Sequence, residues 1–131
     1  MKWTDDQEQV LACNSDNLLV SASAGSGKTM TVIEKIARLI EDEHVDITNL
    51  LVITFTESAS AEMKIRLKDT LSKSAKDNKF VATQLAKLPL GDISTIHAFC
   101  AKMLRKFFFL ANIKPNFAVL DDNSSNFLKS K

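Results

Sequence analysis

Ala22-Ser23-Ala24-Gly25-Ser26-Gly27-Lys28-Thr29 is the stretch that most strongly constrains the fold of this chain. It matches the phosphate-binding P-loop pattern, except that Ala22 stands where the strict pattern has glycine. Gly25 and Gly27 permit backbone conformations that other residues rarely adopt, so successive N–H groups can converge on one anion. The stretch therefore predicts a nucleotide-binding loop between a strand and a helix.

Two side chains at the end of the loop are the expected catalytic residues. Lys28 is expected to reach the β- and γ-phosphates, and the Thr29 hydroxyl is expected to bind Mg²⁺. The positive N-terminal end of the following helix would add to the attraction for phosphate. ATP and Mg²⁺ are the expected cofactors, and the whole loop (Ala22, Ser23, Ala24, Gly25, Ser26, Gly27, Lys28, Thr29) is expected to bind the nucleotide.

Apolar periodicity outlines the elements around this loop. Helices are expected over residues 4–12, 28–40, 58–74, 80–88 and 97–110, and strands over 17–22, 50–55, 93–96 and 117–120. This alternation predicts an α/β fold with a parallel sheet flanked by helices, in a single domain. The unalternating run 50–55 predicts a strand covered on both faces. The Phe-rich helix, residues 99–110, is expected to lie in the core.

Charge is unevenly distributed along a chain whose net charge is only +1. Residues 60–110 hold ten basic side chains against four acidic ones, whereas residues 1–59 hold four against ten. A basic segment of this kind fits contact with a polyanion. A lysine-rich, solvated helix face explains it equally well.

No long apolar segment or secretory signal is visible in the sequence. Cys13 and Cys100 lack metal-site spacing and are expected to be reduced thiols packed against apolar neighbours. We therefore expect a cytoplasmic protein without a membrane partner.

Three ordered motifs resemble the superfamily 1 DNA helicases of the UvrD/Rep/PcrA type. The first is the P-loop, which often begins with alanine in that family. The second is Thr54-Phe55-Thr56-Glu57-Ser58-Ala59-Ser60-Ala61-Glu62-Met63-Lys64-Ile65-Arg66, similar to T-F-T-x-x-A-A-x-E-M-x-x-R. The third is Thr95-Ile96-His97-Ala98-Phe99, similar to T-x-H-S-F. The resemblance implies a RecA-like P-loop NTPase fold, of which residues 1–131 would form an incomplete N-terminal portion of motor domain 1A.

Within that family, three segments look most like the AddA (RexA) type of helicase/nuclease. They are the opening Trp3-Thr4-x-x-Gln7, residues 93–100 and residues 115–121. A plain UvrD/Rep-type helicase without a nuclease remains the alternative, as does a non-catalytic nucleotide-binding remnant. The AddA resemblance implies processing of double-strand DNA ends for recombinational repair, an exonuclease domain in the parent and an AddB-type partner subunit.

The resemblance also implies roles for residues outside the loop. Gln7 would read adenine, although it also completes a helix capping box with Thr4. Phe55, Thr56, Arg66, Thr95 and His97 would contact single-stranded DNA. Phe55 could instead end a buried strand, His97 could be satisfied by nearby backbone, and lysines beside Arg66 could serve solubility alone.

One departure weakens the DNA assignment, and one requirement for hydrolysis is not met. Glu57 replaces the asparagine usual in the family, and a carboxylate repels phosphate. The acid that positions the attacking water is not evident, because Asp121-Asp122 lack the family's continuation. We therefore expect residues 1–131 to be a fragment that binds nucleotide without efficient hydrolysis.

Overall fold

The computed structural model describes residues 2–23, 25–114 and 116–119. Its elements follow in the order α1 (Asp5–Ala12), α2 (Lys28–Glu41), η1 (Ile47–Asn49), β1 (Leu51–Thr54), α3 (Glu57–Ser74), α4 (Lys79–Lys87), η2 (Leu88–Leu90), β2 (Asp92–Thr95) and α5 (Ile96–Lys106). The chain divides into two compact units, Met1–Ser94 and Thr95–Lys131. All five expected helices are therefore present, and α5 is shorter than expected.

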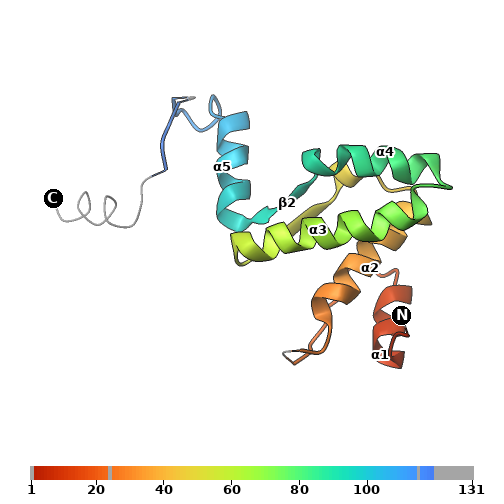
Figure 1. Cartoon of the computed structure of the whole chain (residues 1–131). Helices are drawn as coiled ribbons and strands as arrows, with labels where there is room; N and C mark the ends of the chain where they lie inside the picture. Colours follow the sequence, from red (N-terminus) through yellow and green to blue (C-terminus); the bar gives the residue numbers. More distant parts are fainter. Residues whose placement is uncertain (1, 24, 115, 120–131) are drawn as a thin grey trace. The chain divides into compact units, whose positions relative to one another are not determined.

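The core of the first unit forms where α2, α3 and α4 pack together (Figure 1). On α3, Met63, Leu67 and Leu71 recur at helical spacing and are buried, as the sequence predicted. The α2 residues Ile33, Ile36, Ala37 and Ile40 face the same cluster. The remaining buried members are Ile47, Val81, Leu88 and Ile93.

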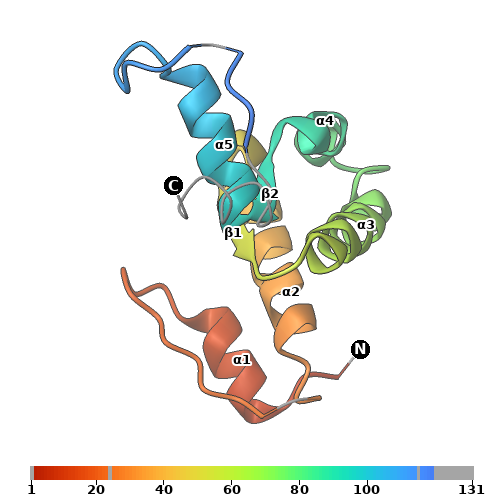
Figure 2. The same cartoon turned by 90° about the vertical axis from the view of Figure 1, so that its left-hand side faces the viewer.

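β1 and β2 form a two-stranded parallel sheet, with α3 and α4 between them in sequence (Figure 2). The expected coverage of β1 on both faces is wrong. Leu51 and Ile53 are exposed, while Val52 and Thr54 are half-buried. The alternation arises because successive strand residues point to opposite faces, and the described residues cover only one of them.

The expected buried strand at residues 17–22 is also wrong. These residues form no strand, and Leu18, Leu19 and Val20 are all exposed. Apolar composition favours burial, but a strand also needs a neighbour for its backbone N–H and C=O groups. No strand among the described residues pairs with this segment.

A polar cluster fixes the approach to β1. Gln84 on α4 is buried, and its Oε1 accepts a hydrogen bond from the backbone N–H of Ile47 at 2.9 Å. Asp46 forms an ion pair with Lys87 at 2.5 Å. That ammonium group, together with hydrogen bonds from Thr48, holds the pKa of the Asp46 carboxyl well below its usual range.

The second unit contains α5, and none of that helix's residues is buried. The expectation that residues 99–110 lie in the core is therefore wrong for this chain. The described part of the unit has no second helix or strand to cover α5. The expected strand 117–120 is also wrong for Phe117–Val119, which are not in a strand; Leu120 and Asp121-Asp122 lie outside the described residues.

Two smaller expectations can be compared with the structure. Both cysteines are free thiols, but Cys100 is exposed rather than packed against apolar neighbours. None of the helices in the described part of the chain is both long and apolar enough to span a bilayer.

Candidate nucleotide-binding site

The loop before α2 takes the backbone conformation that its glycines permit. Gly25 has φ +79° and Gly27 has φ +84°, both in the left-handed region that disfavours residues with a Cβ. Gly27 is also the N-cap of α2, and no side chain caps that helix start. The free N–H groups of the first turn therefore remain available to an anion.

Lys28 folds back over this loop. Its Nζ donates to the carbonyl oxygen of Ser23 at 2.6 Å and to that of Ala22. Thr29 follows on the first turn of α2 and is exposed. The ammonium group therefore lies beside the helix start, where it complements the N–H groups as a partner for phosphate. Ala24 lies outside the described residues.

Gln7 joins the first turn of α1 to the loop. Its Oε1 accepts from the backbone N–H of Thr4 at 3.0 Å, and its Nε2 donates to the carbonyl of Ser26 at 3.2 Å. The Thr4 hydroxyl in turn accepts from the Gln7 backbone N–H, which confirms the expected capping box. These bonds fix which end of the carboxamide is oxygen, and leave one N–H and one lone pair for another partner.

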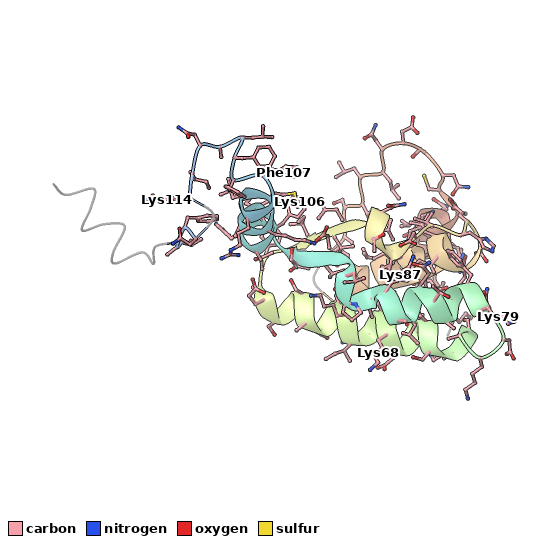
Figure 3. The ribbon with its side chains drawn as sticks, turned by 90° about the horizontal axis from the view of Figure 1, so that it is seen from above. Lys68, Lys79, Lys87, Lys106, Phe107 and Lys114 are labelled. Atoms are coloured by element: carbon pink, nitrogen blue, oxygen red, sulfur yellow. The ribbon has the colours of Figure 1, made fainter. Side chains whose placement is uncertain are left out.

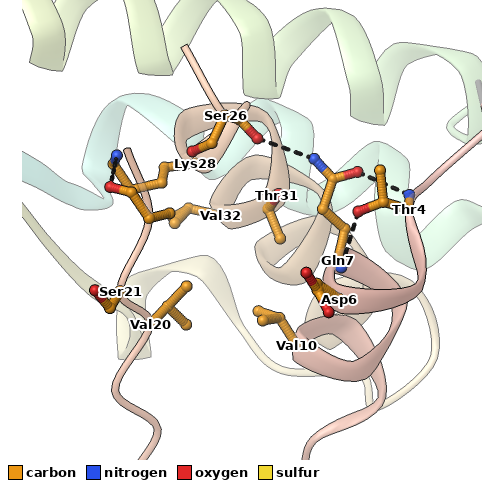
Figure 4. A pocket seen from close by; sticks show the side chains of 11 residues that line it. Thr4, Asp6, Gln7, Val10, Val20, Ser21, Ser26, Lys28, Thr31 and Val32 are labelled. Carbon is orange, nitrogen blue, oxygen red and sulfur yellow. Dashed lines mark hydrogen bonds between the residues drawn. The ribbon is translucent and has the colours of Figure 1, made fainter. Parts of the chain in front are cut away.

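A cavity of about 500 Å³ opens between α1, residues 20–22 and the start of α2 (Figure 4). In this view Gln7 and Lys28 lie on opposite sides of it. Val10, Val20 and Val32 supply apolar surface between them. The volume lies in the range of ordinary small-molecule sites, and the lining combines an apolar wall with a few polar groups.

Sequence reasoning missed these three valines. The signal was present, because Val10 lies one turn after Gln7 and Val32 one turn after Lys28. Val20 had been assigned to a buried strand. A Cβ at Gly27 would lie 3.0 Å from Gln7 Nε2, so the loop and α1 are already in close contact.

The residues expected to contact DNA in the first unit lie at the corner between β1 and α3. Phe55 is fully exposed, so the alternative of a buried strand end is wrong. Thr56 is the N-cap of α3, and its hydroxyl accepts from the Ala59 N–H at 3.1 Å. Thr54 Oγ1 donates to the Thr56 carbonyl at 3.0 Å, which stiffens the corner. Glu57 occupies the first turn of α3, where a carboxylate favours the helix dipole.

Arg66 lies further along α3 and forms an ion pair with Glu62 on the same helix. At 1.5 Å per residue it is roughly 15 Å along the axis from Thr56, so the two do not bind the same phosphate. Other basic side chains of this unit, among them Lys68, Lys79 and Lys87 in Figure 3, also lie on α3 and α4.

Thr95 and His97 belong to the second unit. Thr95 is buried and caps α5, with its hydroxyl accepting from the Ala98 N–H at 3.2 Å. His97 follows in the first turn of α5 and is exposed. The threonine thus has a structural task, whereas the imidazole is open to solvent.

A glycine-rich loop that opens a helix, with a lysine over it and a cavity beside it, is the arrangement of the P-loop nucleotide-binding proteins. Comparison with protein families is more specific. Residues 3–130 match the UvrD/REP helicase N-terminal domain. The chain therefore belongs to that family, as the three motifs indicated.

Relatives within the family share one description, the A subunit of an ATP-dependent helicase/nuclease. Those from Thermoanaerobacter sp. (strain X514) and Desulforudis audaxviator are 44% and 40% identical to this chain, each over 98% of its length. The counterpart from Bacillus licheniformis is 40% identical over 96% of it. The chain spans 11% of the length of each of these relatives.

Proposed function

We propose that this chain is the ATP-binding first portion of the motor of an AddA-type ATP-dependent DNA helicase/nuclease. The observation that carries the proposal is the cavity with Lys28 and the uncapped start of α2 on one side and Gln7 on the other. Similarity to proteins named as the A subunit of an ATP-dependent helicase/nuclease supports the choice within the family.

The residues fit ATP at both ends. Lys28 and the N–H groups from Gly25 to Thr29 would hold the phosphates, and the three valines would contact the base. Adenine offers a donor and an acceptor on one edge, which match the lone pair and the N–H that Gln7 retains. Thr29 would ligate Mg²⁺, an ion that neutralises charge on the phosphates.

For the DNA side of the proposed activity, Phe55 and His97 would contact single-stranded DNA by stacking. Both rings are exposed, and stacking on aromatic side chains is the usual mode of sequence-tolerant binding. Thr56 and Thr95 would contribute by fixing the helix starts, and Arg66 by attraction of phosphate further along α3. Translocation, processing of DNA ends, the exonuclease and an AddB-type partner are part of the proposal for the longer parent protein, as is its place in the cytoplasm.

The experiment is steady-state ATP hydrolysis by this chain, with and without single-stranded DNA, alongside Lys28→Ala and the control Lys76→Ala. Lys76 is in the turn after α3, away from the lining of the cavity. We expect little turnover in all three, with nucleotide binding only in the wild type and the control. Because the single tryptophan, Trp3, precedes Thr4 of the cavity, its fluorescence can report that binding.

DNA-stimulated hydrolysis that Lys28→Ala abolishes would contradict the proposal that this chain binds without efficient turnover. Absence of nucleotide binding in the wild type would contradict the proposed site itself. Binding that survives in Lys28→Ala and fails in Lys76→Ala would place the site elsewhere.

A further inference from the structure

Helix α1 has little apolar contact to hold it in place. Leu11 is its only buried residue, although the helix carries both Gln7 and Val10 of the cavity. The last turn of α1 also contains no basic residue to complement its carbonyl groups. Polar contacts from outside the helix must therefore fix its position over the loop.

Lys35 supplies that contact from the middle of α2. Its half-buried side chain donates to the carbonyl of Leu11 at 2.9 Å, to that of Cys13 at 2.7 Å, and to Asn14 Oδ1 at 3.5 Å. Three acceptors match the three N–H groups of an ammonium. A cation at a helix C-terminus is also favoured by the helix dipole.

The other contacts between α1 and α2 are weaker or lie at the opposite end. Arg38 approaches Glu8 at 3.7 Å, and it is shared with Glu34 at 3.1 Å on its own helix. Gln7 reaches Ser26 at the start of α1. Lys35 is thus the contact that ties the far end of α1 to the helix bearing Lys28.

We infer that Lys35 is a positioning residue, which sets the base side of the nucleotide site by holding α1 against α2. This inference rests on the proposed nucleotide site. It makes a distinction that a merely stabilising role would not make. Release of α1 should displace Gln7 and Val10, whereas the phosphate side, built on residues 25–29, should keep its geometry.

The experiment compares the affinities of ATP and of inorganic tripolyphosphate for this chain and for Lys35→Met, which preserves most of the side-chain length without the charge. Tripolyphosphate contacts only the phosphate side. We expect Lys35→Met to bind ATP about tenfold more weakly, and tripolyphosphate within about twofold of the wild type. Lys35→Arg, which keeps a cation, should retain more ATP affinity than Lys35→Met, and the control Lys76→Met should change neither.

Each outcome is decisive for one of the two claims. A wild-type chain that binds neither ligand contradicts the proposed nucleotide site. Wild-type binding with an equal loss for both ligands in Lys35→Met, or no loss for either, contradicts the positioning role alone. If Lys35→Met does not fold, Lys35→Gln, which keeps a donor without the charge, is measured against the same criterion.

Discussion

The cavity beside the P-loop and the corner at Phe55–Thr56 both lie at the start of a helix, yet the chain organises them to different degrees. At the cavity, Lys28 and Gln7 each make hydrogen bonds to backbone groups of other segments. At the corner, the hydrogen bonds stay within a few residues and Phe55 is fully exposed. Tertiary contacts thus shape the proposed nucleotide side, whereas local helix capping alone shapes the proposed DNA side.

The largest expected effect comes from Gly27→Ala at the nucleotide side. A Cβ at φ +84° is strained and would meet Gln7 Nε2, so the loop must distort or release α1. We expect ATP affinity to fall about thirtyfold, equivalent to about 2 kcal/mol. Isothermal titration calorimetry measures it, and unchanged affinity would mean that the observed loop conformation is not needed for binding.

Gly91→Ala provides the matched comparison. Its added Cβ would meet Ile47 in the core rather than the cavity. This variant should lower the melting temperature while leaving ATP affinity unchanged. A loss of affinity equal to that of Gly27→Ala would remove the distinction between the loop and the rest of the unit.

A smaller effect is expected from Phe55→Ala at the corner. Since the ring has no burial to lose, the free energy of unfolding should be unchanged. Single-stranded DNA affinity should fall about tenfold, as for loss of one stacked base. Fluorescence anisotropy with a labelled oligonucleotide measures the affinity, with the exposed Ile65→Ala of α3 as control. Equal DNA binding by wild type and Phe55→Ala would exclude Phe55 from the DNA contact.

Thr56→Ala should act on stability. It removes the acceptor for the Ala59 N–H at the start of α3, and loss of such a cap costs about 1 kcal/mol. Urea denaturation measures the change. Thr56→Ser, which keeps the hydroxyl, should be close to the wild type; equal losses in both variants would show that the cap is not the cause.

The smallest effect concerns pH and the Asp46–Lys87 pair. The folded-state pKa of Asp46 lies below its unfolded value of about 3.9. The pair therefore adds stability above that value, which is lost as pH falls through it toward the folded pKa. Melting temperatures of wild type and Asp46→Asn should thus differ slightly at pH 7 and converge below about pH 3. A difference that persists or grows on acidification would contradict this assignment.

The contrast between the two sides also explains what the sequence could predict. The P-loop, the Thr4–Gln7 capping box and the α3 stripe are local patterns, and the structure contains all three. The error at Leu18–Val20 arose because apolar runs do not reveal whether a strand has a partner. Lys35 was overlooked because its acceptors at the end of α1 lie more than twenty residues earlier. Contacts of that kind depend on tertiary packing, which no local spacing encodes.

The most direct test of the central claim is calorimetric titration of Mg²⁺-ATP into the wild-type chain, Lys28→Ala and Lys76→Ala. The account predicts one site in the wild type and an unchanged site in Lys76→Ala. It predicts binding at least about tenfold weaker in Lys28→Ala, because a charge-assisted contact to phosphate is lost. Equal affinity in all three proteins, or no binding in the wild type, would contradict it.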